Sequence, residues 1–153
     1  MEIIDKLKSL NIILPEGPAP VGAYVAHKTI GKLIFISGQL PIKADGKIII
    51  GKVGKDLTLE QGQKAAYYCC INLLAQLNSA CQKDLNKVKN CVKISGFVNS
   101  TNDFKDQAKV LNSASELLVK IFGDAGKHAR AAVSVNSLPL GSSVEIESVF
   151  EII

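Results

Sequence analysis

The order of hydrophobic patterns along this chain limits its fold more than any single motif does. Two long segments repeat apolar residues at the spacing of an α-helix, and strand-like segments precede, separate and follow them. The predicted order is therefore strands, helix, strand, helix and a final pair of strands. Because two helices can cover only one face of a sheet, we predict an α+β fold in which one mixed β-sheet carries both long helices on one face.

The sequence also predicts where the two long helices begin and end. The first begins at Thr58, since Gln61 stands three residues later and completes a capping box. Its buried face is expected at Ala65, Ala66, Cys69, Cys70, Leu73, Leu74 and Leu77. The second is predicted over residues 103–122, where Gly123 is placed to end it. Its inward residues are expected to be Phe104, Ala108, Leu111, Leu118 and Phe122.

Shorter apolar or alternating runs predict strands at residues 23–29, 32–37, 47–50 and 88–98. The carboxyl-terminal part alternates with period two on both sides of a turn at Pro139-Leu140-Gly141, which predicts a pair of adjacent strands. If these two strands form a simple hairpin, Arg130 and Glu145 are separated by roughly 13 Å, measured along the strand direction. A shifted register, a bulge or a neighbouring subunit would each close that gap.

Length and composition fit one domain. The 153 residues are 47% apolar with a net charge of +4, which suffices for a packed core and excludes a disordered chain. We predict an amino-terminal extension over residues 1–19, with a short helix and a proline-rich lead-in, and a single domain over residues 20–153. No apolar run approaches the ~18 residues of a membrane span. Charges in the first ten residues interrupt any signal sequence, so we expect a cytoplasmic protein.

Cysteine, histidine and lysine usage argues against several classes of site. The cysteines match no CxxC pattern, so we expect reduced thiols at Cys69, Cys70, Cys81 and Cys91. His27 and His128 have no neighbouring ligand residue, and we therefore expect no metal site. The 17 lysines are scattered singly rather than in a run, which predicts a solvated surface and no nucleic-acid partner.

Arg130 is the only arginine of the chain. A guanidinium binds a carboxylate through two parallel hydrogen bonds, so Arg130 is a candidate carboxylate anchor; a salt bridge to one of the 14 acidic residues is the alternative. Glu145 and Glu147 share one polar strand face, where either could orient a water molecule or move a proton, or both could simply be solvated. Tyr24 is a candidate pocket wall or a plain strand aromatic.

Several short motifs follow one another in a distinctive order. They are Gly22-Ala23-Tyr24-Val25, Ser37-Gly38-Gln39-Leu40-Pro41, Val98-Asn99-Ser100 with Asp103-Phe104, Asn112, Ala129-Arg130-Ala131-Ala132-Val133, Leu138-Pro139 and Val144-Glu145-Ile146-Glu147. Together they resemble the Rid family, also called YjgF or endoribonuclease L-PSP, over residues 20–153. The resemblance implies a chorismate-mutase-like plait, assembled as a homotrimer with three clefts between subunits. It also implies hydrolysis of reactive enamines and imines, such as 2-aminoacrylate, to 2-keto acids and ammonia without a cofactor.

The same resemblance implies roles for individual residues. Arg130 corresponds to the arginine that holds the substrate carboxylate, and Glu145 to the acid that positions water or protonates. Tyr24 corresponds to the tyrosine that lines the cleft. Positions near the subunit junction, which we count with the substrate-binding set, correspond to Ser37, Gly38 and Asn112.

The chain departs from the family pattern at four places. Two residues after the arginine, where deaminases of the family commonly have cysteine, it has Ala132, which can offer only its backbone N–H. His128 replaces the proline that is usual before the Ala-Arg pair. Residues 1–19 are an extension and residues 43–56 are longer than in simple members, as in a longer subgroup of the family.

Three functions therefore stay open from the sequence. The leading one is the imine and enamine hydrolase, with a small carboxylate-bearing metabolite as its partner. The second is a ribonuclease or translation inhibitor, as the older family name suggests. Cleavage of RNA usually needs a paired acid and base and a cationic groove, for which isolated histidines and dispersed lysines offer little. The third is a non-catalytic trimer that binds small carboxylates.

Overall fold

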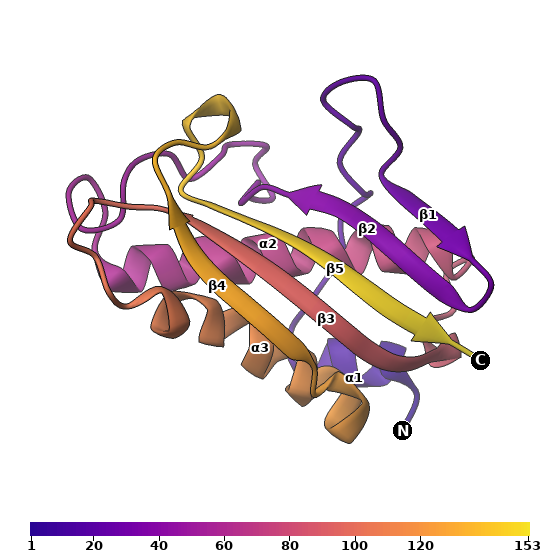
Figure 1. Cartoon of the computed structure of the whole chain (residues 1–153). Helices are drawn as coiled ribbons and strands as arrows, with labels where there is room; N and C mark the ends of the chain where they lie inside the picture. Colours follow the sequence, from indigo (N-terminus) through magenta and orange to yellow (C-terminus); the bar gives the residue numbers. More distant parts are fainter.

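The computed structural model of the chain contains one five-stranded sheet with all its α-helices on the same face (Figure 1). The spatial order of the strands is β1-β2-β5-β3-β4, and only the β3–β4 pair is parallel. Their bounds are β1 His27–Ile30, β2 Leu33–Gln39, β3 Val88–Asn99, β4 Ala129–Val135 and β5 Val144–Ile152. The predicted α+β class and single mixed sheet are confirmed.

Three α-helices and three short 3-10 helices complete the chain. The α-helices are α1 Ile3–Ser9, α2 Leu59–Ala80 and α3 Gln107–Phe122. The 3-10 helices are η1 Leu85–Lys87, η2 Gly123–Gly126 and η3 Pro139–Gly141. The capping box at Thr58 and Gln61 is present, and Gly123 ends α3 with a positive φ of 62°. No helix is both long and apolar enough to cross a membrane.

The predicted direct pairing of the last two strands is wrong. α3 connects β3 to β4, so these two strands run parallel, and β5 pairs with the opposite edge of β3. A helical crossover places its second strand beside its first, which leaves β4 at the edge of the sheet. β3 therefore lies between β4 and β5, and the residues around η3 form a wide connection instead of a hairpin turn.

Two other strand predictions need correction. The first strand begins at His27 rather than residue 23, because the backbone N–H of Val21 donates to the Tyr24 hydroxyl at 3.1 Å and folds the preceding residues into a loop. Residues 47–50 form isolated bridges, one of them between Ile50 and Ser142, and no regular strand. The apolar pattern of residues 47–50 thus identified extended backbone, but it did not show that these residues lack a strand partner in the sheet.

The core lies between the sheet and α2 and α3. Every residue predicted on the buried face of α2 is fully buried, and all four cysteines are free and buried, as expected. α3 begins at Gln107 rather than residue 103, and the predicted inward residue Ala108 is exposed. Leu111 and Leu118 are buried as predicted, and they are joined by Val110, Ala114, Leu117 and Ile121.

The amino-terminal residues, which include the short helix α1, pack on the rest of the domain. Leu7 of α1 and Ile12 belong to the same hydrophobic core as the sheet and the long helices. Farther along, the Gln76 side chain of α2 donates to the Pro18 carbonyl at 2.7 Å. This bond holds the proline-rich segment against the carboxyl-terminal half of α2, where it borders the cleft described below.

The face of the sheet away from the helices is left uncovered and carries apolar side chains. Leu33, Phe35 and Val133 on this face are 37%, 44% and 48% exposed. Glu145 and Glu147 of β5 project on the same side, since they alternate with buried Ile146. An exposed apolar patch of this kind is typical of a protein interaction surface or a ligand-binding site.

Gly96 of β3 allows α3 to approach the sheet closely. A methyl group at this position would collide with the Leu111 side chain, whose Cδ2 would lie 2.9 Å away. We therefore expect Gly96→Ala to lower the free energy of unfolding by about 1–3 kcal/mol through overpacking. Denaturant unfolding measures this loss. In a Leu111→Ala background, where the space is vacated, the same substitution should cost clearly less; an equal cost in both backgrounds would contradict the contact.

Candidate active site

The predicted site residues fall into two groups in the structure. The first, which we call the Glu145 half-site, contains Tyr24, Gly38 and Glu145 and lies where β2 and β5 meet the loop before β1; Ser37 precedes Gly38 on β2 but lines a neighbouring cavity. The second, the Arg130 half-site, contains Asn112, Arg130 and Ala132 and lies at the edge formed by β4 and α3. Each half-site has its own geometry.

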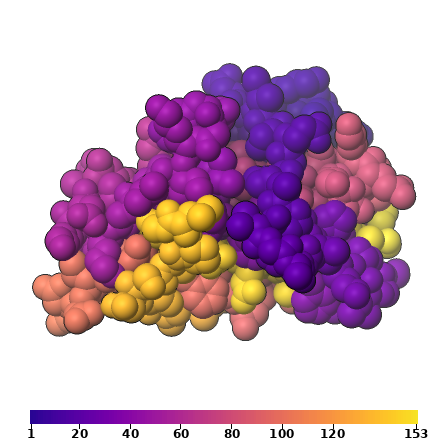
Figure 2. Space-filling model, turned by 90° about the horizontal axis from the view of Figure 1, so that it is seen from above, coloured from indigo at the N-terminus to yellow at the C-terminus, as the bar shows by residue number.

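Glu145 lies in a cleft with a volume of about 310 Å³. It is the only charged residue among those that line this cleft, and most of its neighbours are apolar: Pro18, Ala19, Pro20, Val21, Leu40, Ile42, Pro139 and Leu140. The proline-rich segment and η3 therefore form two walls, and Figure 2 shows these segments, in indigo and in yellow, side by side at this end of the molecule. The cleft can hold a small molecule with an apolar part next to a carboxyl group.

Gly38 brings β2 against the Glu145 carboxyl group. A Cβ atom at Gly38 would overlap Oε1 of Glu145 and would lie 2.9 Å from its Cδ. The pairing of β2 with β5 also shifts register between Ile36 and Gln39, so Gly38 sits within a local irregularity of the ladder. Glycine at this position thus leaves room for the carboxyl group between the two strands.

The pKa of the Glu145 carboxyl is raised above its usual value. The main cause is burial, which disfavours the ionised form, and the negative charge of Glu147 adds to it. Glu145 forms no ion pair that would oppose this effect. A carboxyl group with a raised pKa can hold and release a proton closer to neutral pH, as general acid–base catalysis requires.

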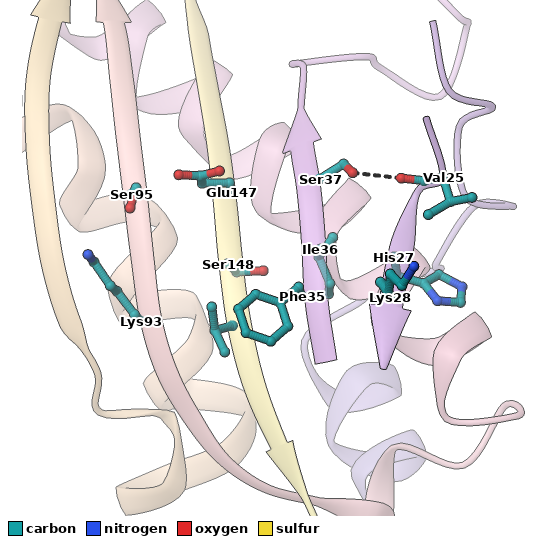
Figure 3. A pocket seen from close by; sticks show the side chains of 11 residues that line it. Val25, His27, Lys28, Phe35, Ile36, Ser37, Lys93, Ser95, Glu147 and Ser148 are labelled. Carbon is teal, nitrogen blue, oxygen red and sulfur yellow. Dashed lines mark hydrogen bonds between the residues drawn. The ribbon is translucent and has the colours of Figure 1, made fainter. Parts of the chain in front are cut away.

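Tyr24 and Ser37 are fixed by the backbone of the loop before β1. The Tyr24 hydroxyl accepts from the Val21 N–H, and its own proton remains available to a ligand in the cleft. The Ser37 hydroxyl donates to the Val25 carbonyl at 2.7 Å, as the dashed line in Figure 3 shows. Ser37 lines a second cavity on the open sheet face, about 390 Å³ in volume, together with Glu147.

Arg130 lies on β4 with its guanidinium against α3. Its Nη1 donates to Oδ1 of Asn112 at 2.9 Å and to Oγ of Ser115 at 3.1 Å. No acidic side chain neutralises it, since none of the ion pairs in the structure includes Arg130. A guanidinium has five N–H donors, so donors remain for an anion such as a carboxylate.

Ala132 follows two residues later on the same side of β4, partly buried and packed on the core. Its methyl group has no chemistry to offer, so only the backbone of this position can contact a ligand. The sequence alone did not point to Ser115, although it lies one helical turn after Asn112 and the i, i+3 spacing is a signal for a shared partner. Nor did it indicate the proline-rich wall, for which local pattern gives no signal.

The two half-sites cannot act together within one protomer. Arg130 pairs with Ile94 of β3, whereas Glu145 pairs with Phe97, so the two levels are three residues apart, or about 10 Å along β3. Ile94 is buried beneath the helices and Phe97 projects on the opposite face, so Arg130 and Glu145 also point to opposite sides of the sheet. Of the routes that would join them, only a neighbouring subunit fits this topology.

Comparison with known proteins identifies the family. A family model described as "YjgF/chorismate_mutase-like, putative endoribonuclease" matches residues 5–151. The chain belongs to the YjgF family. The YjgF fold and the resemblance expected from the motifs are thereby confirmed.

Individual YjgF relatives differ in how much of the chain they match. Protein TCP17 of Trypanosoma cruzi is 40% identical over 147 residues, which are 95% of this chain and 91% of that protein. The crystal structure of Atu1372 from Agrobacterium tumefaciens, a protein of unknown function, is 41% identical with a TM-score of 0.91 and covers 99% of this chain and 94% of its own. RidA from the Antarctic bacterium Psychrobacter is 30% identical with a TM-score of 0.62, covering 90% of this chain and 94% of its own.

The charge of Glu147 should be measurable in the titration of Glu145. We expect Glu147→Gln to lower the pKa of Glu145, because it removes the neighbouring negative charge while leaving the burial unchanged. Carboxyl carbon NMR titration measures the pKa, and a Glu145→Gln variant assigns the resonance. Glu60→Gln, in the first turn of α2, is the matched control and should leave the pKa of Glu145 unchanged. An unchanged pKa in Glu147→Gln would contradict the coupling.

Proposed function

We propose that this YjgF protein hydrolyses 2-imino acids and their enamine tautomers, 2-aminoacrylate among them, to 2-keto acids and ammonia. The observation that carries the proposal is the state of Arg130, a charged guanidinium held by two neutral oxygens and bound to no carboxylate of its own chain. Such a group is prepared to bind the carboxylate of a small anion. The similarity to RidA and the family motifs support the same reaction class.

The proposed assembly is a homotrimer in which each site is shared by two subunits. The edge of one protomer, with Arg130 and Asn112, would lie against the open sheet face of the next, with Tyr24 and Glu145. This arrangement is supported by the separation of the half-sites within one protomer and by the uncovered apolar face with Phe35. It would bury that face and place a cation and a carboxyl group on the same substrate.

The chemistry follows from what the two half-sites can do. Arg130 binds the substrate carboxylate and thereby fixes the position of the imine carbon. The ionised Glu145 accepts a proton from water as the water oxygen bonds to that carbon and the C=N bond becomes a C–N single bond. Protonated Glu145 then returns the proton to the nitrogen of the tetrahedral adduct. Glu145, ionised again, takes the hydroxyl proton of the adduct and passes it to the nitrogen; the C–N bond breaks as the C=O bond forms, and ammonia leaves.

The surroundings of Glu145 suit both proton transfers. Its raised pKa makes the protonated form accessible closer to neutral pH than for a solvated glutamate. The apolar lining of the cleft limits the water around the reacting carbon to a few molecules and accommodates the substrate side chain. No nucleophilic serine or cysteine is required, since water itself attacks the polarised C=N bond.

Removal of the guanidinium tests the proposal. With 2-imino acids generated in solution by an amino-acid oxidase, we expect Arg130→Ala to lower kcat/KM by about 30-fold or more, as for the loss of one partner of a charged pair. Arg130→Lys should recover part of the activity, since it keeps the charge without the two-pronged geometry. Lys127→Gln removes an exposed cation three residues away, which pairs with Asp124 and not with Arg130, and should leave kcat/KM unchanged.

The other functions are distinct outcomes of this experiment. Saturable binding of 2-keto acids by the wild-type protein without faster imine hydrolysis would replace the proposal with a non-catalytic carboxylate-binding protein. Cleavage of RNA that persists in Arg130→Ala after rigorous removal of contaminating nucleases would replace it with the ribonuclease named in the family description.

A further inference from the structure

Arg130 belongs to a chain of hydrogen bonds that continues beyond its direct partners. Ser115 Oγ, which accepts from Arg130, lies 2.9 Å from Nε2 of His128, and Nδ1 of His128 lies 2.7 Å from the Gly126 carbonyl oxygen. The chain therefore links η2, the start of β4 and α3 through side chains that are partly buried. His128 has no role in the two half-sites defined above, and Ser115 enters them only as a partner of Arg130.

The direction of each hydrogen bond follows from the chemistry of its partners. A carbonyl oxygen can only accept, so Nδ1 of His128 carries the proton and donates to Gly126. In the neutral ring Nε2 is then an acceptor, and the Ser115 hydroxyl donates its single proton to it. The lone pairs of Ser115 Oγ are thus left for the guanidinium, which can only donate.

We infer that His128 and Ser115 are positioning residues that hold the Arg130 guanidinium ready for the substrate carboxylate. This inference rests on the proposed function for its effect on catalysis. His128 fixes the rotation of the Ser115 hydroxyl so that its oxygen always faces Arg130, and Ser115 with Asn112 fixes the guanidinium at two points. A guanidinium that is already ordered loses less conformational entropy when the anion binds.

The η2 turn keeps His128 in the required place. A methyl group on Gly126 would collide with the Leu118 carbonyl of α3, so the turn lies directly on the backbone of that helix. The Gly126 carbonyl that accepts from His128 is therefore part of a closely packed corner. Removing Ser115 releases its contacts with Arg130 and His128, whereas removing His128 releases its contacts with Ser115 and with the Gly126 carbonyl.

The test combines kinetics with spectroscopy of the single arginine. We expect Ser115→Ala and His128→Phe each to raise KM for a 2-imino acid and the Kd for a 2-keto acid roughly tenfold, with kcat nearly unchanged, because the anchor binds ground state and transition state alike. Ser115→Thr keeps the hydroxyl and should restore both constants. The double variant should have the same KM and Kd as Ser115→Ala, since both residues act through one contact with Arg130.

A second readout does not depend on turnover. Arg130 is the only arginine, so its side-chain nitrogen NMR signals are unambiguous, and in both variants they should broaden or average as the guanidinium rotates more freely. Ser113→Ala is the matched control, because this neighbouring hydroxyl donates to the Gln63 carbonyl and does not touch Arg130.

The outcomes separate this inference from the proposed function. Unchanged arginine signals and unchanged Kd in His128→Phe would overturn the positioning role, even if the wild-type enzyme is active. A fall in kcat without a change in KM would also contradict it. The variants could show altered arginine signals and weaker keto-acid binding while the wild-type protein hydrolyses no imine. That result would support the positioning role and overturn only the proposed reaction.

Discussion

A guanidinium held by neutral oxygens is the interaction on which the account of this protein depends. Because Asn112 and Ser115 carry no charge, they fix Arg130 without neutralising it, and its charge remains available to a ligand. An internal glutamate or aspartate in the same place would have made Arg130 a structural ion pair. The choice of partners on α3 thus decides whether this edge of the sheet binds an anion or only stabilises the fold.

The sheet topology sets the second constraint. With β3 between β4 and β5, Arg130 and Glu145 face opposite sides of one sheet, and a site that uses both must be completed by another copy of the chain. The uncovered apolar face supplies a physical reason for that copy to bind. In the proposed trimer, activity therefore depends on assembly.

The sequence predicted the parts of this structure that depend on local pattern. Periodicity and capping located α2, and the single arginine and the motifs around Glu145 indicated the candidate site residues, whose roles stay predictions. The pairing of β4 and β5 was wrong because strand neighbours are decided by the crossover through α3, which period-two alternation does not record. The proline-rich wall and the His128–Ser115 contact were missed because they join residues distant in sequence through tertiary packing.

Subunit mixing tests the shared site most directly. Arg130→Ala and Glu145→Gln proteins, each inactive alone, are unfolded together and refolded as an equal mixture. If each site takes Arg130 from one subunit and Glu145 from its neighbour, every mixed trimer regains one intact site, and the mixture should recover about a quarter of wild-type activity. A mixture that forms trimers and stays as inactive as its components would show that the site does not combine these residues across the interface.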